Sequence, residues 1–427
     1  MVRSFILLCA LALAACSPQA FLKKELTRIE SKLQEHAGFA LYDPQKQKFL
    51  LQHRADRYYT PASNTKIFTL YTAHRLLGDS LPAIKYTEQN DSLFFWGMGD
   101  PSFLYRYSFQ NGKIFNFLKN YPGTLVFSSA NFHTERFGEG WAWDDYKYAY
   151  SPERSSFPIY GNLVTIQRDS LRQLRVHPPA FGDAVEVVPS LTGEHGPDRL
   201  PHGNAILLRQ AHERPADWDV PFHYSDSLLV KLLADTLKRP VLLANVRMNG
   251  SAQIMRSVPA DSLYKVMMQE SDNFIAEQLL LQCAAVLSDS LRPEIAIRYA
   301  KKNLMNDLPD EPRWVDGSGL SRYNLFTPRS VVVLWEKLRK EIPEQRLYAL
   351  LATGGKAGTI QNYFKADTPY LFGKTGTLSN NHCLSGFLIT KRGRTLVFSF
   401  MHNNFVQPTR VVRQQMQSFL NNVHEKY

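Results

Sequence analysis

The sequence predicts a protein that mixes helices and strands in separate runs, and three observations support this. Short aromatic and β-branched runs, punctuated by Gly, Pro and Asn, fill residues 85–220. Apolar residues at helical spacing dominate residues 260–350. Strand-like runs at 383–389 and 395–400 then precede a last amphipathic helix. The chain is therefore expected to contain both strands and helices, largely in separate runs.

The individual elements follow in order. A first helix is predicted ahead of two strand-like runs, 39–42 and 49–52, whose polar connection indicates a hairpin. A second helix is expected to begin after Pro61 and to end at Gly78, with Ser63 in its first turn. The later elements are strands at 92–95, 125–128, 162–166 and 241–246 and a helix at 225–237. The apolar faces of the first and last helices consist of Leu22, Leu26, Ile29 and Leu33 and of Val412, Met416, Phe419, Leu420 and Val423.

Composition and charge narrow the class of protein. The chain has 427 residues, of which 44% are hydrophobic and 21% charged, enough for a sizeable core and unlike a disordered chain. Lys and Arg exceed Asp and Glu by 50 − 39 = 11, which gives a formal net charge of +11. Such an excess suits an anionic membrane or cell wall. Since no basic run and no nucleic-acid-binding motif occurs, nucleic acid is not an expected partner.

The N-terminus predicts export and a lipid anchor. Arg3 precedes an apolar stretch, residues 5–15, which is too short to span a bilayer and has the form of a secretory signal. It ends in Leu-Ala-Ala before Cys16, which resembles a bacterial lipobox, so residues 1–15 are the expected signal peptide and Cys16 the lipidated residue. An ordinary cleaved signal with a chance Cys is the alternative. After signal cleavage and lipidation of Cys16, Cys283 and Cys383 are the cysteines that remain as ordinary thiols. We expect them to be two buried free thiols rather than a disulfide.

Three short motifs occur in order: Ser63–Lys66 (Ser-Asn-Thr-Lys), Ser271–Asn273 (Ser-Asp-Asn) and Lys374–Gly376 (Lys-Thr-Gly). Each is weak alone, because a second Ser-x-x-Lys occurs at Ser262–Lys265 and Ser-x-Asn also recurs. Their order and context raise the specificity, since the first opens a helix and the last lies near strand-like sequence. This trio is the signature of class A β-lactamases and penicillin-binding proteins.

The chemistry explains these residue types. A serine hydroxyl is a poor nucleophile unless a base takes its proton, and Lys66 lies three residues from Ser63 on the same helical face. Lys66 is a base only when neutral, so its pKa must fall from about 10.4 toward roughly 7. A second ammonium about 4 Å away supplies about 4 kcal/mol toward that shift. Lys374 is the candidate for this second charge and also for binding a substrate carboxylate.

The remaining motif residues suggest further roles. Ser271 is expected to relay a proton to the leaving amine, and Asn273 to hydrogen-bond the substrate backbone. Gly376 lets a peptide pair along the strand edge, and the N–H groups of Ser63 and Thr377 would form the oxyanion hole. Taken singly, Ser63 is also a plausible helix cap, Asn273 a surface residue and Lys374 a solvated charge. The expected site is catalytic Ser63, Lys66 and Ser271 with substrate-binding Asn273, Lys374, Thr375, Gly376 and Thr377.

Beyond the trio, the chain resembles the class C penicillin-binding proteins of the penicillin-binding-protein-4 type, the D-alanyl-D-alanine carboxypeptidase/endopeptidases. The 208 residues between Ser63 and Ser271 (271 − 63 = 208) fit this family, which inserts extra domains there. Two local departures bear on substrate preference, because Tyr363 stands where the family pattern has Arg and His382 where small residues are usual. The matching segments are Gly99–Pro101, Gly140–Asp145, Asn162, Ala276–Glu277, Asp316–Arg322 and Lys374–Leu378.

The resemblance implies an α+β fold of the serine β-lactamase/transpeptidase-like type, an antiparallel sheet flanked by helices. It implies a catalytic domain made of residues 16–85 and 245–427, with one or more β-rich domains inserted at 86–244. The implied activity is a penicillin-sensitive serine D-Ala-D-Ala carboxypeptidase or DD-endopeptidase, acting on peptidoglycan stem peptides in the periplasmic cell envelope. β-Lactams are implied covalent inhibitors, and neither a cofactor nor a metal is implied.

Two alternatives of function remain at this point. A serine β-lactamase or esterase would use the same nucleophile, and a non-catalytic envelope-binding lipoprotein would not need it. The intact motifs argue against the lipoprotein. A set of aromatic residues suggests a glycan-binding groove, although packing is the better interpretation for most of them: Tyr58, Tyr59, Trp141, Trp143 and Tyr146.

Overall fold

The structure is a computed structural model that describes residues 18–189, 196–210, 215–248, 250 and 252–427. It forms two compact units. Unit 1 comprises the described residues of Met1–Tyr71 together with Met267–Ser271 and Tyr299–Tyr427, and unit 2 comprises those of Thr72–Val266 and Asp272–Arg298. These boundaries differ from the predicted catalytic domain and insertion, which stay a prediction. Cys16 and the signal peptide lie outside the described residues.

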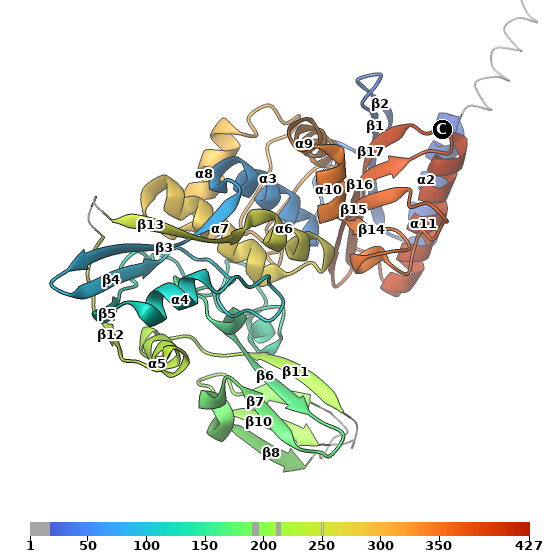
Figure 1. Cartoon of the computed structure of the whole chain (residues 1–427). Coiled ribbons are helices and arrows are strands. Elements are labelled where there is room, and N and C mark those ends of the chain that lie inside the picture. Colours follow the sequence, from blue (N-terminus) through green and yellow to red (C-terminus); the bar gives the residue numbers. More distant parts are fainter. Residues whose placement is uncertain (1–17, 190–195, 211–214, 249, 251) are drawn as a thin grey trace, which may run out of the picture. The chain divides into compact units, whose positions relative to one another are not determined.

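Unit 1 is built on a six-stranded sheet of order β14-β15-β16-β17-β1-β2, in which every neighbouring pair is antiparallel (Figure 1). The predicted hairpin is confirmed as β1 and β2, and both C-terminal strand predictions are confirmed as β16 and β17. The strands are β1 His36–Asp43, β2 Lys48–His53, β14 Ala352–Thr353, β15 Leu371–Leu378, β16 Asn381–Ile389 and β17 Thr395–Asn403.

Helices cover both faces of this sheet. On one face α2 and α11 lie side by side and bury the apolar stripes predicted for them in a core with Phe39, Leu384 and Phe400 (Figure 1). On the other face α9 packs, with Trp335 against Phe387. The helices of unit 1 are α2 Pro18–Leu33, η1 Ala62–Asn64, the start of α3 Thr65–Leu77, α9 Pro328–Glu341, α10 Glu344–Leu350, η5 Gly358–Ile360 and α11 Thr409–Lys426.

The predicted helix after Pro61 differs in one detail. The chain first makes the 3-10 turn η1, and α3 begins only at Thr65. Ala62 has φ 48°, a left-handed conformation that an α-helix does not accommodate. The Thr65 hydroxyl donates to the Ala62 carbonyl at 2.9 Å, which stabilises this turn. Ser63 therefore lies in a tight turn that leads into the helix, rather than in the helix itself.

The described residues of unit 2 form three smaller sheets, which confirms that this part of 85–220 is rich in strands. Their orders are β12-β5-β4-β3-β13, β11-β6-β7 and β8-β10-β9. The strand predicted at 241–246 is shorter than expected. The strands are β3 Ser80–Gln89, β4 Ser92–Gly97, β5 Thr124–Phe127, β6 Leu163–Arg168, β7 Leu174–His177, β8 Val185–Pro189, β9 Gly196–Arg199, β10 Ile206–Gln210, β11 Ala216–Pro221, β12 Val241–Leu243 and β13 Gln253–Pro259.

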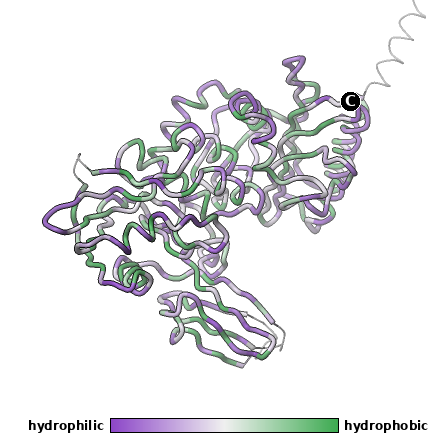
Figure 2. Tube along the Cα trace, in the orientation of Figure 1, coloured by the Kyte–Doolittle hydropathy of each residue, from purple (hydrophilic) through white to green (hydrophobic). Residues whose placement is uncertain are grey.

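The helices of unit 2 pack on these sheets around a second core that includes Phe95, Phe127, Phe157 and Leu233. In Figure 2 the tips of the β1–β2 and β3–β4 hairpins are hydrophilic, as expected of exposed turns. The helical segments are α4 Lys113–Asn120, η2 Trp143–Lys147, η3 Tyr160–Asn162, η4 Pro179–Ala184, α5 Asp226–Leu237, α6 Ala260–Gln269, α7 Asn273–Ser288 and α8 Pro293–Asn303, of which α6 and α8 end in unit 1.

Two further expectations can be compared with the described residues. Cys283 and Cys383 are both buried and free, as favoured from the sequence. Within the described ranges, none of the helices combines the length and the apolar character needed to cross a bilayer.

Candidate active site

Ser63 and Lys66 meet where η1 passes into α3. The Lys66 Nζ lies 2.9 Å from the Ser63 Oγ, so the three-residue spacing brings the two groups into hydrogen-bond contact. Lys66 is fully buried, and its Nζ also donates to the Ser318 carbonyl at 2.7 Å. The amine and the hydroxyl are therefore close enough for a proton to pass directly between them.

The loop that holds Lys66 is organised by one buried carboxylate. Asp316 accepts hydrogen bonds from the backbone N–H groups of Gly319 at 2.8 Å and Ser321 at 2.7 Å. Gly319 has φ +87°, and a Cβ there would lie 1.9 Å from the Ala62 carbonyl oxygen, so only Gly fits against the serine turn. The segment predicted either to shape the site or to be a plain turn therefore contacts Lys66 through its backbone, at the Ser318 carbonyl.

Ser271 and Lys374 form a second pair. The Lys374 Nζ donates to the Ser271 Oγ at 2.8 Å and to the Thr375 carbonyl at 2.8 Å. Ser271 has φ 64°, an uncommon conformation for a non-Gly residue that concentrates at functional sites. Lys374 is fully buried on β15, and burial, followed by the charge of Lys66, lowers its pKa well below the usual value for lysine. The repulsion between the two ammonium groups is mutual, so it disfavours protonation of both at once.

Asn64 joins the serine turn to β15, a role that the sequence analysis missed. Its Nδ2 donates to the Lys374 carbonyl at 3.0 Å, and its Oδ1 accepts from the Ser385 hydroxyl at 2.6 Å. Both side-chain groups of this fully buried residue are thus satisfied. Asn64 lies inside the Ser-x-x-Lys motif, but a polar residue predicted near a helix start gives no signal for a partner 310 residues away (374 − 64 = 310).

Gly376 brings the strand against the serine turn. A Cβ at this position would lie 2.6 Å from the Pro61 carbonyl oxygen and 2.7 Å from the Ser63 backbone nitrogen. Only a residue without a side chain allows β15 to pass this close to Ser63. This close approach brings the strand that carries Thr377 beside the backbone of Ser63. The N–H groups of Ser63 and Thr377 are the ones predicted to form an oxyanion hole.

Asn273, the last member of the second motif, belongs to unit 2. Its Nδ2 donates to the Tyr150 carbonyl at 2.9 Å, and it is the first residue of α7. The preceding Asp272 caps that helix by accepting from the Ile275 N–H at 2.8 Å, and it accepts from the Tyr105 hydroxyl at 2.6 Å. The Asp272 side chain therefore stabilises the start of α7, and the predicted role of Asn273 in substrate binding stays a prediction.

The opposite face of β15 carries the two threonines. The Thr375 hydroxyl donates to the Thr359 hydroxyl at 2.7 Å, and the Thr377 hydroxyl lies 2.8 Å from the His382 Nδ1. Of these side chains, Thr359, Thr375 and His382 line a small recess together with Tyr363 and Arg413. Burial, and after it the charge of Arg413, lowers the pKa of His382 well below its usual range, so the imidazole is neutral. The sequence analysis missed Arg413, because nothing near it in the sequence belongs to a catalytic motif.

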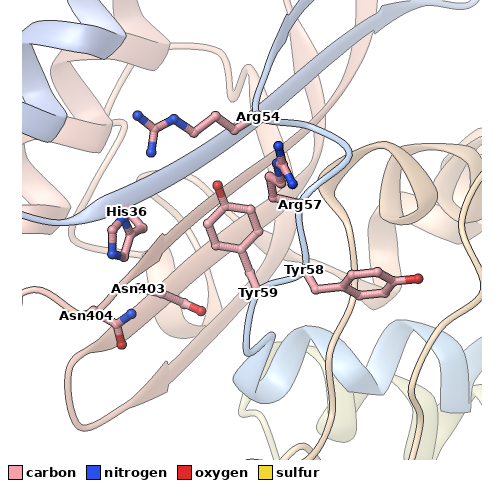
Figure 3. A pocket seen from close by; sticks show the side chains of 7 residues that line it. All are labelled: His36, Arg54, Arg57, Tyr58, Tyr59, Asn403 and Asn404. Carbon is pink, nitrogen blue, oxygen red and sulfur yellow. The ribbon is translucent and has the colours of Figure 1, made fainter.

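A separate pocket of about 400 Å³ lies in unit 1, at the start of β1 and the end of β17 (Figure 3). Tyr58 and Tyr59, which the sequence analysis considered for a glycan-binding groove, both line it. Tyr59 is almost fully buried, and Figure 3 shows its ring between His36 and Arg57. The Tyr59 ring is therefore packed in the protein interior and also forms part of the pocket wall. The pocket contains none of the predicted site residues, and the chain runs from it through Thr60 to the serine turn.

A family model and a curated relative both relate this chain to D-Ala-D-Ala carboxypeptidases. The chain matches the D-Ala-D-Ala carboxypeptidase 3 (S13) family over residues 20–189 and 221–423. It is 22% identical to the D-alanyl-D-alanine carboxypeptidase DacB of Haemophilus influenzae, over 90% of this chain and 89% of that protein.

Two solved structures share the fold. Penicillin-binding protein 4 (DacB) of Haemophilus influenzae superposes with a TM-score of 0.76 at 21% identity, covering 93% of this chain and 99% of the other. A predatory endopeptidase of Bdellovibrio bacteriovorus, solved with an immunity protein, superposes with a TM-score of 0.53 at 16% identity, covering 91% and 93%. The expected α+β fold is thereby confirmed.

Proposed function

Because the chain belongs to the D-Ala-D-Ala carboxypeptidase 3 (S13) family, we propose that Ser63 is the nucleophile of a serine D-Ala-D-Ala carboxypeptidase and that Lys66 is its general base. The enzyme acts on peptidoglycan peptides in the cell envelope, as a carboxypeptidase, a DD-endopeptidase or both. The observation that carries the assignment of roles is the 2.9 Å contact between the Lys66 Nζ and the Ser63 Oγ inside a buried cluster.

The proposed reaction is acyl transfer in two steps. Neutral Lys66 takes the hydroxyl proton as the Ser63 Oγ attacks the carbonyl carbon of the penultimate D-Ala. The C–N bond then breaks, the nitrogen receives a proton through Ser271, and D-Ala leaves. Water hydrolyses the resulting ester and regenerates the serine. A crosslinked peptide with the same stereochemistry would react in the same way and make the enzyme an endopeptidase.

Lys374 has two proposed roles in this scheme. Its position against Ser271 supports proton relay, and its proximity to Lys66 disfavours a second proton on the pair. Thr375, Gly376 and Thr377 would bind the substrate along β15, and the N–H groups of Ser63 and Thr377 would stabilise the oxyanion. One oxyanion-hole donor is worth about 3–4 kcal/mol in enzymes where its loss has been measured. Asn273 is proposed to contact the substrate backbone from the start of α7.

The test is intact-mass spectrometry of purified protein after incubation with penicillin. The wild-type enzyme should gain the mass of one penicillin, and Ser63→Ala should gain none. Ser262→Ala is a matched control, because Ser262 opens the second Ser-x-x-Lys of the chain, and its hydroxyl donates to the Pro259 carbonyl at 2.6 Å. An adduct that persists on Ser63→Ala would overturn the assignment. Rapid turnover of penicillin without a persistent adduct would favour a β-lactamase.

Mass spectrometry of the products from defined muropeptides distinguishes the two peptidase activities. A monomeric pentapeptide stem that loses one D-Ala indicates a carboxypeptidase. A crosslinked dimer that yields two stems indicates an endopeptidase. Both products should vanish in Ser63→Ala, since one nucleophile would serve both reactions.

We further propose that residues 16–85 and 245–427 form the catalytic domain around an inserted 86–244, and that a lipid on Cys16 anchors the mature protein to a membrane. The anchor rests on the lipobox-like sequence before Cys16 and on the excess of basic residues, which suits an anionic surface. Cys16→Ser should leave an unlipidated protein that is released from membranes or retained as precursor, with unchanged catalysis when purified. A variant that still partitions with membranes would contradict the anchor.

A further inference from the structure

We propose that the pocket at the start of β1 and the end of β17 binds a phosphate group. The pocket has a volume of about 400 Å³ and contains none of the proposed site residues, so the inference goes beyond the proposed function. Two arginines, a histidine, two tyrosines and two asparagines line it, and no described Asp or Glu does (Figure 3). A cavity with several convergent polar groups and an excess of positive charge is suited to an anionic ligand.

One deeply buried donor points into this pocket. Tyr59 is only 4% exposed, and its hydroxyl makes no hydrogen bond with any described residue. Figure 3 shows the hydroxyl pointing into the space between His36 and the two arginines. Burial, and after it the negative charge of Glu30, raises the pKa of Tyr59, so the hydroxyl keeps its proton and donates. A buried donor without a partner costs free energy, so a ligand oxygen that accepts from it is bound favourably.

The structure holds Tyr59 in place before any ligand binds. Its backbone N–H donates to the Phe326 carbonyl at 2.9 Å, and its carbonyl accepts from the Phe326 N–H at 3.0 Å. Its ring packs against the backbone of β1 at Gly38, where a Cβ would lie 2.4 Å from a ring carbon. The Asn403 side chain binds both backbone groups of Thr60, at 2.7 Å and 3.2 Å. The donor therefore loses little conformational freedom when a ligand binds.

The positive charge at the pocket is only partly compensated. The Arg54 guanidinium lies 3.3 Å from the Glu30 carboxylate, which also lies 2.9 Å from the His53 ring. The Arg57 guanidinium makes no ion pair and no hydrogen bond with any described residue. The exposed Asp56 precedes it in the chain but does not line the pocket. An Arg side chain contacts phosphate oxygens with two parallel N–H groups, so Arg57 is the expected anchor of the ligand.

The arrangement of the donors favours phosphate over a carboxylate. His36 opens β1, Arg57 and Tyr59 lie in the connection that follows β2, and Asn404 follows β17. The Asn404 side chain likewise makes no hydrogen bond with the described part of the chain. A carboxylate offers two oxygens in one plane, whereas a phosphate monoester offers three oxygens in a tetrahedral arrangement. Donors that come from three separate segments therefore match the phosphate better.

The pocket is close to Ser63 but separate from it. Thr60, Pro61 and Ala62 connect Tyr59 with Ser63, and four steps along a chain span at most about 14 Å. A phosphate in the pocket would thus occupy a second site beside the proposed active site, and loss of this second site should leave the chemistry at Ser63 intact.

The test is isothermal titration calorimetry of the purified protein with sodium phosphate, near neutral pH and at low ionic strength. The wild type should bind phosphate at one site. Arg57→Gln should weaken the binding by about tenfold to a hundredfold, the range for a hydrogen bond to a charged group. Tyr59→Phe keeps the ring that packs on Gly38 and removes only the donor, so it should weaken binding by about tenfold. Acetate, with two oxygens, should bind the wild type about tenfold more weakly than phosphate or worse.

Arg410→Gln is the matched control, because Arg410 is an exposed arginine of α11 that does not line the pocket. It should bind phosphate as the wild type does, and an equal loss in this variant would reduce the binding to an effect of net charge. That result would overturn the site, as would a wild type that binds no phosphate or binds acetate equally well. Unchanged affinity in both Arg57→Gln and Tyr59→Phe would overturn it too. Penicillin acylation should be unchanged in both pocket variants, whereas a wild type that takes up no penicillin would overturn the proposed function and not the phosphate site.

Two sources carry such a group, a soluble phosphate ester and a lipid headgroup. The 16-residue helix α2 is about 24 Å long and separates Pro18, which follows the predicted lipidation site, from the pocket near its other end, so a soluble ester is expected. The Cys16→Ser protein, which lacks the proposed lipid, should therefore not be retained by phosphatidylcholine vesicles that contain phosphatidic acid, a lipid phosphate monoester. Retention that Arg57→Gln abolishes would assign the bound phosphate to a lipid headgroup instead. Retention that persists in Arg57→Gln, together with unchanged titration by free phosphate, would overturn the site.

Discussion

The two faces of β15 differ in how firmly their polar groups are held. On the face toward the serine turn, Lys374 is fully buried and makes two short hydrogen bonds, and Lys66 is fixed by Ser63 and Ser318. On the opposite face, Arg413 makes one long contact with Thr377 and has a donor without a partner among the described residues.

This difference suggests a division of work along one strand. Proton transfer depends on distances that are set before the substrate arrives. Buried lysines whose ammonium groups are already held by short hydrogen bonds suit this task. Recognition of an anion depends on donors that the ligand itself satisfies, so an incompletely bonded cation suits it. Substitutions on the first face should therefore alter the chemical step for every substrate. Substitutions on the second face should act mainly on substrate binding, because Thr375 and Thr377 are proposed to bind the substrate along β15.

The largest effect is expected from Lys66→Ala. Without this amine no base is left beside the Ser63 hydroxyl, so acylation by penicillin near neutral pH should fall roughly a thousandfold or more. Time-resolved intact-mass spectrometry measures this rate. Lys265→Ala, in the second Ser-x-x-Lys, should acylate as the wild type does. An acylation rate for Lys66→Ala within tenfold of the wild type would show that another group is the base.

Gly376→Ala should rank second. The new methyl group would lie 2.6–2.7 Å from the serine turn, so the turn must shift, and displacement of a catalytic group by about 1 Å costs on the order of a hundredfold in rate. Overpacking should also lower the free energy of unfolding by about 1–3 kcal/mol. Chemical denaturation and acylation kinetics test both. Gly203→Ala, where a Cβ meets nothing within 4 Å, is the control.

Lys374→Ala should change the pH dependence of acylation. Removal of a neighbouring positive charge makes a proton on Lys66 easier to hold, so the base becomes neutral only at higher pH. The acidic limb of the rate should therefore move upward, by on the order of one pH unit for each 1.4 kcal/mol of lost repulsion. Lys374→Gln should move the limb equally, because the missing factor is charge. An unmoved limb would leave Lys374 without an electrostatic role.

The smallest effect is expected on the recess side. Thr359→Ala removes the partner of the Thr375 hydroxyl, a neutral hydrogen bond of 2.7 Å. The loss of about 1 kcal/mol should weaken substrate binding about fivefold, measured as a higher KM for a D-Ala-D-Ala peptide, and leave kcat unchanged. A fall in kcat with an unchanged KM would mean that this face also supports the chemical step, and the two faces of β15 would not differ in function.

Much of the site follows from the sequence because the spacing is local. Ser63 and Lys66 are three residues apart at a predicted helix start, so their contact needs no information about the rest of the chain. The amphipathic patterns of α2 and α11 and the turn between β1 and β2 are local for the same reason. The order of the three motifs likewise predicted the family, and the family implied the fold.

Tertiary structure alone decided which distant groups complete the site. The Ser318 carbonyl reaches Lys66 because Gly319 fits against Ala62, and Asn64 joins the serine turn to β15. Arg413 reaches Thr377 because α11 packs on that face of the sheet. None of these contacts follows from spacing or residue type, since each depends on how two separate segments pack in the fold. The partners are 36 residues apart for Thr377 and Arg413 and 310 residues apart for Asn64 and Lys374. The sequence by itself predicted the contact between Ser63 and Lys66, and the fold determined which groups surround it.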